Sequence, residues 1–239
     1  MTGEIWHYRD GDVALRGEIY RPVGHPNGRS VLVVHEADGI GGNVRRHCAM
    51  LAERGYLAAA ADLHGDGRVL EGEAVASAIA AFRDDPALFR HRVRAGFDAM
   101  AMLPGVAGER SAAVGYCFGG AAVLELARSG APIAAVASFH GLLTTALPAR
   151  AGVVSARVLA CTGARDPLVP PADIAAFQQE MTDADADWQL LVFGRALHSF
   201  TNDQVDSRGD PRMAYDRIAD VQSWEVMLRF FEDTFAGGS

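Results

Sequence analysis

The sequence lacks a block of basic residues and a long apolar run, and each absence excludes a class of protein. Its 239 residues carry 22 basic and 30 acidic side chains, for a formal net charge of −8. Without a basic patch, neither nucleic acid nor an anionic membrane surface is an expected partner. No segment approaches the roughly eighteen apolar residues of a membrane-spanning helix. Residues 1–4 open no basic-then-apolar signal peptide, so we expect a cytoplasmic protein.

Cysteine is scarce as well. The three cysteines are Cys48, Cys117 and Cys161. An odd number without a C-x-x-C pair indicates neither a disulfide framework nor a zinc site, so no metal is expected. The reducing cytoplasm would also suit a reactive thiol.

What is present is ordinary for a soluble globular protein, with 49% hydrophobic and 22% charged residues. There are no internal repeats or low-complexity tracts. The length suits one large α/β unit, and we predict a single domain over residues 1–239.

Strand-like apolar runs alternate with helical stripes along the whole chain. Strands are expected at residues 4–8, 13–20, 31–34, 57–61, 133–139, 157–161 and 188–193. Apolar stripes at helical spacing lie within residues 44–52, 75–82, 88–100, 177–181 and 224–231. Asp10-Gly11 marks a hairpin turn, and Asn43 and Asp85 are expected helix N-caps. The pattern predicts an α/β fold with a mostly parallel sheet, helices on both faces and an antiparallel N-terminal hairpin at the edge.

One stretch organises the chain: an apolar run from Ala112, then Gly115-Tyr116-Cys117-Phe118-Gly119, then a helical pattern. This is the G-x-nucleophile-x-G elbow, in which a strained strand-to-helix turn presents one side chain. A Cβ at Gly115 or Gly119 would collide there, and the following helix N-terminus favours a thiolate. We interpret Cys117 as a nucleophile; the alternative is a buried structural cysteine.

A thiol nucleophile needs a histidine and an acid that orients the histidine. In folds with this elbow the chain order is nucleophile, acid, histidine, and Asp166 and His198 satisfy it, each just past a predicted strand. A turn-stabilising aspartate and a solvated loop histidine are the alternatives. His140 also follows a strand but breaks the order, and Asp173 and Asp187 are weaker candidates for the acid.

Glu36 ends the strand that leads into Gly39, where the loop of an oxyanion hole belongs. This position predicts the backbone N–H groups of Ala37 and Phe118 as the oxyanion donors. Geometry alone leaves Glu36 open between a contact with Cys117 and a solvent-facing carboxylate.

The motifs together resemble the dienelactone hydrolase family of α/β-hydrolases, in order over nearly the whole chain. The segments that carry the resemblance are Val33-Val34-His35-Glu36-Ala37-Asp38-Gly39, Ala61-Asp62-Leu63-His64-Gly65, Gly115-Tyr116-Cys117-Phe118-Gly119-Gly120, Gly163-Ala164-Arg165-Asp166 and Leu197-His198-Ser199-Phe200. The resemblance implies an α/β-hydrolase fold and a triad of Cys117, Asp166 and His198, with Glu36 hydrogen-bonded to the resting thiol. It also implies hydrolysis of an enol-lactone or related ester through a thioester, without a cofactor. Separately, we expect the protein to be a monomer or homodimer.

One position departs from the family. An arginine that grips the substrate carboxylate is expected four residues after the histidine, and Asn202 stands there. No arginine follows until Arg208, and Arg83, Arg90 or Arg195 would have to substitute. An anionic lactone and an uncharged ester or lactone are therefore both open as substrates.

Other classes of function fit less well. Gly39-Ile40-Gly41 with Asp62 some twenty residues on suggests a dinucleotide-binding oxidoreductase, but Val44 replaces the third glycine. In a glutamine amidotransferase of class I, the acid and histidine lie close together near the C-terminus, unlike Asp166 and His198. A non-catalytic binding protein on the same fold is the third alternative.

Overall fold

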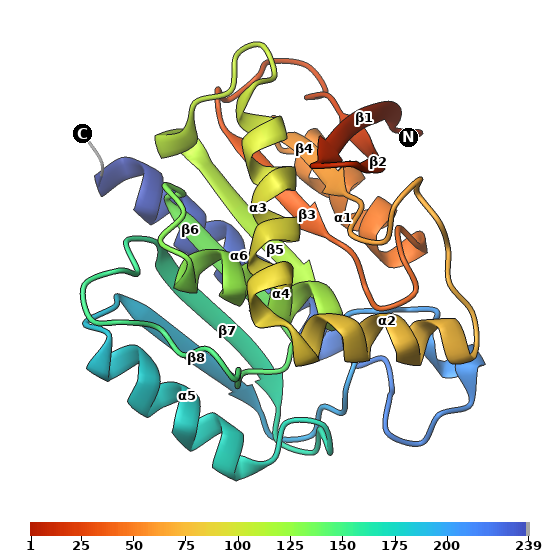
Figure 1. Cartoon of the computed structure of the whole chain (residues 1–239), viewed down its shortest axis with the longest axis vertical. Helices are drawn as coiled ribbons and strands as arrows, with labels where there is room; N and C mark the ends of the chain where they lie inside the picture. Colours follow the sequence, from red (N-terminus) through yellow and green to blue (C-terminus); the bar gives the residue numbers. More distant parts are fainter. Residues whose placement is uncertain (238–239) are drawn as a thin grey trace.

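Residues 1–237, the part of the chain that the structure describes, form an eight-stranded sheet covered by helices on both faces in this computed structural model (Figure 1). The strands are β1 (Glu4–Asp10), β2 (Val13–Tyr20), β3 (Ser30–Val34), β4 (Leu57–Ala61), β5 (Ser111–Tyr116), β6 (Ala135–Phe139), β7 (Arg157–Gly163) and β8 (Trp188–Phe193). They lie in the order β1-β2-β4-β3-β5-β6-β7-β8. The strands from β4 to β8 in this order run parallel, whereas β1 and β2 are antiparallel at one edge. This confirms the predicted fold class.

The central strands are apolar throughout because they are covered on both faces. Every residue of β3, β4, β5 and β6 is buried, whereas buried and exposed residues alternate along most of β1 and β2. The parallel strands end at one shared edge. The loops that carry the predicted site residues leave the sheet at that edge, where open α/β sheets bind their ligands.

Two helical layers enclose the sheet. The helices are α1 (Gly42–Glu53), α2 (Glu73–Asp84), α3 (Pro86–Ala101), α4 (Phe118–Arg128), α5 (Pro171–Asp183) and α6 (Arg217–Gly237), with short 3₁₀ turns at Gly108–Arg110 and Val205–Arg208. One core holds α3, α4 and α5 against the sheet through Phe97, Val123 and Phe177. The other holds α1 and α6 through Cys48 and Phe231. None of the helices within residues 1–237 is both long and apolar enough to cross a bilayer.

Local signals placed most boundaries correctly, and two needed correction. The Asp85 side chain accepts a 2.9 Å hydrogen bond from the Leu88 N–H and begins α3, as predicted. The hairpin turn is shorter than expected, because β1 continues to Asp10. The prediction that Asn43 caps α1 is wrong. The helix begins at Gly42, and the Asn43 side chain is buried and bonded to distant residues described below.

Candidate active site

Cys117 lies in the tight turn between β5 and α4, with φ +54° and ψ −115°. A positive φ in a residue with a side chain is strained, and such strain gathers at functional sites. A Cβ on Gly115 would overlap the carbonyl oxygen of Gly119, and a Cβ on Gly119 would overlap that of Val34. Neither glycine has a positive φ, so close backbone contact, not conformation, requires them.

Two strand-end loops bring an imidazole and an acid to the sulfur. His198 Nε2 lies 3.0 Å from Cys117 Sγ, and His198 Nδ1–H donates a 2.8 Å hydrogen bond to Asp166 Oδ2. The other carboxylate oxygen of Asp166 accepts a 2.8 Å bond from the Leu168 N–H, which fixes the acid. The structure therefore places the three side chains in one hydrogen-bonded line. This arrangement allows the imidazole to take the proton of the thiol.

The electrostatics of this line favour charge separation. Burial alone would lower the pKa of His198, but the facing Cys117 thiolate and the Asp166 carboxylate outweigh burial and raise the pKa to about 10. A protonated His198 would in turn stabilise negative charge on the sulfur that it faces. Helix α4 begins at Phe118, directly after Cys117, and its N-terminal partial positive charge also favours the thiolate.

The other two cysteines are in a different environment. Cys48 and Cys161 are buried and belong to the core on the α1 and α6 side of the sheet. Burial raises the pKa of both thiols, which makes them poor nucleophiles at neutral pH. Cys48 is therefore a core residue on the apolar stripe expected within residues 44–52.

The predicted oxyanion donors flank the sulfur. Ala37, Cys117 and Phe118 line the same cavity. Phe118 is the first residue of α4, where backbone N–H groups have no acceptor within the helix. Ala37 lies in a tight loop after β3, closed by a 3.1 Å bond from the Gly39 N–H to the carbonyl of Glu36.

Two histidine side chains form hydrogen bonds to the backbone carbonyls of that loop. His35 Nε2 accepts a 3.0 Å bond from the Leu63 N–H, which leaves Nδ1–H to donate to the carbonyl of Glu36 at 2.6 Å. His64 Nε2–H donates a 2.9 Å bond to the carbonyl of Ala37. Burial and the neighbouring His64 lower the pKa of His35 to about 4, so its ring is neutral. Sequence analysis gave these histidines no role, although each closely follows a buried strand at the ligand-binding edge.

Glu36 is buried in the cavity wall and is bonded to Asn202. The Asn202 Nδ2–H group donates a 2.8 Å bond to Glu36 Oε2. Burial and the charge of Asp38 raise the pKa of Glu36 to about 7. The thiol–Glu36 hydrogen bond that the family resemblance implies is not formed among the described residues, where the sulfur pairs with His198.

His140, the alternative to His198, contacts the backbone of the elbow and not the sulfur. Its Nδ1 accepts a 3.1 Å hydrogen bond from the Cys117 N–H. Burial and the nearby His198 lower the pKa of His140, so the ring is neutral and its proton is on Nε2. That N–H donates a 2.8 Å bond to Thr201 Oγ1, three residues after His198.

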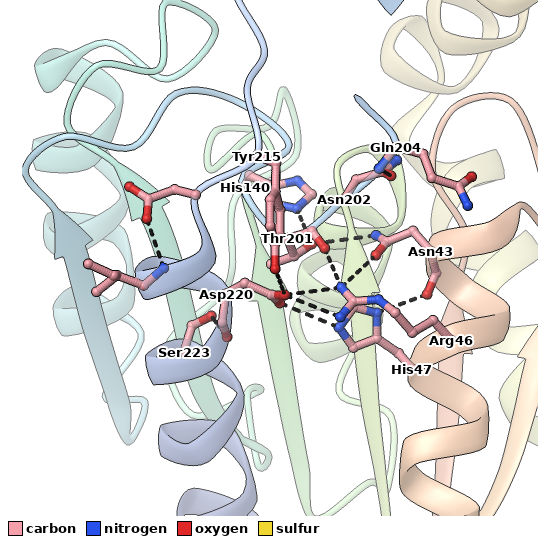
Figure 2. A network of polar contacts seen from close by, with 12 residues as sticks. Asn43, Arg46, His47, His140, Thr201, Asn202, Gln204, Tyr215, Asp220 and Ser223 are labelled. Carbon is pink, nitrogen blue, oxygen red and sulfur yellow. Dashed lines mark hydrogen bonds and ion pairs between the residues drawn. The ribbon is translucent and has the colours of Figure 1, made fainter. Parts of the chain in front are cut away.

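Thr201 connects the site to a polar network between α1 and α6 (Figure 2). Arg46 donates a 2.5 Å bond to the Thr201 carbonyl and also pairs with Asp220 of α6 at 3.2 Å. Asn43 donates a long 3.4 Å bond to Thr201 Oγ1 and accepts one from Arg46, so it cannot cap its own helix. His47 Nε2 lies 3.8 Å from Asp220 Oδ1. The loop that carries His198 and Asn202 is thus bonded to α1 and, through Arg46, linked to α6. These two helices cover the face of the sheet opposite α3 and α4.

The sulfur opens into a cavity of about 910 Å³. Glu36, Cys117 and His198 line it together with apolar residues of α2. Arg208 lines the cavity, whereas Asn202 is turned away into its bond with Glu36. Within residues 1–237, no cluster of three His, Cys, Asp or Glu side chains is arranged to hold a metal ion.

The sheet order and the strand-turn-helix elbow place the chain among the α/β-hydrolases. Over residues 15–235 it matches the dienelactone hydrolase family, and the chain belongs to that family. The resemblance of its motifs is therefore confirmed.

Known proteins give the same result. A solved dienelactone hydrolase-like promiscuous phosphotriesterase from metagenomic libraries is 38% identical, with a TM-score of 0.91 over 98% of both chains. A protein of Yersinia pestis, provisionally named carboxymethylenebutenolidase, is 27% identical over 214 residues, which cover 84% of this chain and 76% of the relative. Pyrococcus horikoshii acylaminoacyl peptidase, at 17% identity and a TM-score of 0.68, covers 97% of this chain with 42% of its own length and shows the fold alone. Family and relatives together support a hydrolase.

Proposed function

We propose that the chain hydrolyses a small carboxylic ester or lactone through a thioester on Cys117. The observation that carries this proposal is the 3.0 Å approach of His198 Nε2 to Cys117 Sγ inside the cavity, with Asp166 orienting the ring. The names of the relatives agree with ester or lactone chemistry.

In the acylation step the Cys117 thiolate attacks the carbonyl carbon and forms a C–S bond. The carbonyl oxygen becomes an oxyanion, and the N–H groups of Ala37 and Phe118 stabilise the negative charge. When the intermediate collapses, the C–O bond to the alcohol breaks. The leaving alkoxide takes the proton of the His198 imidazolium, which leaves a thioester and a neutral imidazole.

In the deacylation step His198 removes a proton from water, and the hydroxide attacks the thioester carbonyl. The C–S bond breaks, the acid leaves and the thiolate–imidazolium pair is restored. Glu36 stands beside this pair and titrates near neutrality, so its charge sets how strongly the imidazolium is favoured. Water is the only reactant besides the ester, and no cofactor is part of the proposal.

The test is turnover of p-nitrophenyl acetate and dienelactone by the wild type and by Cys117→Ala. Triad members act as a unit, so Cys117→Ala and His198→Ala should each lower turnover by about 10⁴-fold. Rapid quenching should also trap an acyl group on the peptide that contains Cys117. Wild-type activity in Cys117→Ala would contradict the mechanism, and saturable binding without any turnover would favour the binding-protein alternative.

A phosphotriester is a second candidate substrate, favoured by the 38% identity over 98% of the chain to a promiscuous phosphotriesterase. The same sulfur would attack phosphorus, form an S–P bond and release the alcohol, and water would then cleave that bond. Release of p-nitrophenol from diethyl p-nitrophenyl phosphate tests this activity, and it should disappear in Cys117→Ala.

A further inference from the structure

One wall of the cavity is apolar and comes mainly from one helix. We call this wall the α2 subsite; it consists of Val75, Ala76, Ile79, Ala80, Phe82 and Phe89. We propose that the α2 subsite binds the acyl group of the substrate, and that the substrate class is an uncharged ester with an apolar acyl chain longer than acetyl. This inference rests on the proposed thioester chemistry and adds the identity of the group transferred to Cys117.

Helix α2 faces the cavity with an apolar stripe that the fold buries only in part. Val75, Ile79 and Phe82 follow the spacing i, i+4, i+7, yet Phe82 is the buried residue of this helix. Val75 and Ile79 are half-buried, and both line the cavity. In Figure 1, α2 lies below α3 and α4, away from the central strands of the sheet. An acyl chain against this stripe would remove it from water, which is the main source of binding energy for apolar groups.

An aromatic floor connects the sulfur to the subsite. The Phe118 ring follows Cys117 directly and stacks on Phe89 with centroids 4.8 Å apart. Phe82 lies 5.4 Å from Phe118 and 5.2 Å from Phe89. The backbone N–H of Phe118 is a proposed oxyanion donor, so a carbonyl held there places its substituent beside the Phe118 ring. The chain of that substituent then continues over apolar atoms to α2.

The charged groups of the cavity argue against an anionic acyl group. Three arginines line the cavity, and each is already paired with an aspartate: Arg83 with Asp84 at 3.1 Å, Arg208 with Asp38 at 2.6 Å and Arg212 with Asp210 at 2.6 Å. A substrate carboxylate would have to compete with these aspartates for the same guanidinium groups. Glu36 adds a further negative charge to the cavity when it ionises. The position where the family has a substrate-binding arginine is occupied by Asn202, which is bonded to Glu36.

Vinyl esters test the proposal, because their alcohol part is too small to compete for the subsite. We would measure kcat/KM for vinyl acetate, vinyl butyrate and vinyl hexanoate, each divided by its rate of hydroxide hydrolysis. Each buried methylene is worth about a fourfold gain, so hexanoate should exceed acetate by at least about tenfold. Monovinyl adipate, the hexanoate with a terminal carboxylate, should fall about tenfold or more below vinyl hexanoate.

Two neighbouring alanines of α2 provide matched variants. Ala80 lines the cavity, whereas Ala81 is exposed on the outer side of the helix. Ala80→Trp should lower the ratio of hexanoate to acetate kcat/KM by about tenfold or more, because the indole occupies the space of the acyl chain. Ala81→Trp should keep the wild-type ratio. Circular dichroism on both variants checks that α2 and the fold are retained.

The outcomes separate the two proposals. A flat chain-length series, equal rates for hexanoate and monovinyl adipate, or equal ratios in both tryptophan variants would overturn the α2 subsite while Cys117-dependent hydrolysis of vinyl acetate stands. Hydrolysis of vinyl acetate that survives Cys117→Ala would overturn the thioester mechanism instead. Failure of the wild type to hydrolyse any vinyl ester would overturn both.

Discussion

Asn202 and Glu36 are 166 residues apart in the chain and share a buried 2.8 Å hydrogen bond beside the Cys117–His198 pair. The bond fixes a carboxylate whose pKa burial and the charge of Asp38 raise to about 7. It also occupies the side-chain amide of Asn202, which stands where the family resemblance places an arginine. Glu36 is thus a buried acid that changes charge within the physiological pH range.

Glu36→Gln should stabilise the protein at high pH and leave it unchanged at low pH. The folded pKa lies above the ordinary value of 4.5, so ionisation of the folded protein lags behind that of the unfolded chain, and stability falls as pH rises from about 4.5 to about 7. The glutamine keeps an oxygen for the Asn202 bond and removes the charge. The gain should reach about 3 kcal/mol at pH 8 at most and vanish near pH 4.

Urea unfolding at pH 4.5 and pH 8 measures this difference. The control is Glu73→Gln, which changes an exposed carboxylate in the first turn of α2 and should alter stability little at either pH. Equal stability of wild type and Glu36→Gln at both pH values would show that Glu36 is not held in a perturbed environment.

Alkylation by iodoacetamide should distinguish Cys117 from the other two cysteines most clearly at low pH. The pKa of His198 is raised to about 10, so the imidazolium that stabilises a thiolate on Cys117 is still present at pH 6. An ordinary thiol with a pKa near 8.5 is well under about 1% thiolate at that pH. Cys117 should therefore be labelled at pH 6 at least about a hundredfold faster than Cys48 or Cys161.

His198→Asn is the matched variant for this measurement, because it removes the cation and keeps a polar side chain. Labelling of Cys117 in this variant should drop steeply between pH 8 and pH 6, as for a free thiol. Mass spectrometry of the labelled peptides gives the rate at each site. Equal labelling of the three cysteines in the wild type would argue against an activated thiol at Cys117.

Thr201 should matter for stability through its hydroxyl group. Thr201→Val leaves the Nε2–H group of His140 buried without an acceptor, and an unpaired buried donor costs about 1–3 kcal/mol. Thr201→Ser keeps the hydroxyl and should be less destabilised than Thr201→Val, although it also loses a methyl group. If urea unfolding finds Thr201→Val as stable as the wild type, the bond from His140 contributes nothing.

The parts of the site that sequence predicted are those encoded by adjacent residues. Gly115, where an added Cβ would meet the carbonyl of Gly119, and the aspartate before Pro86 carry their structural reason within a few positions. Chain order was enough to select Asp166 and His198, because parallel strands bring successive loops to one edge.

The parts that sequence missed depend on partners far along the chain. Asn43 has the composition of a helix cap, but Thr201, 158 residues away, and Arg46 take up its side chain. The bond between Asn202 and Glu36 has no local signature either. Such pairings depend on how loops and helices meet in three dimensions, which periodicity and capping rules do not describe.

The close contact between β5, β3 and the start of α4 leads to a prediction about two glycines. Gly119→Ala would drive a Cβ into the carbonyl oxygens of Val34 and His35, which are backbone atoms and cannot rotate away. Overpacking of this kind costs about 1–3 kcal/mol or more, and separation of α4 from β3 would also shift the Ala37 loop, so stability and ester turnover should fall together. Gly194 is the control: it has no heavy atom within 4 Å of an added Cβ and its φ is not positive, so Gly194→Ala should be neutral or slightly stabilising. Urea unfolding compares the free energy of unfolding of the two variants. A Gly119→Ala variant with wild-type stability would contradict the close contact between Gly119 and the carbonyls of Val34 and His35.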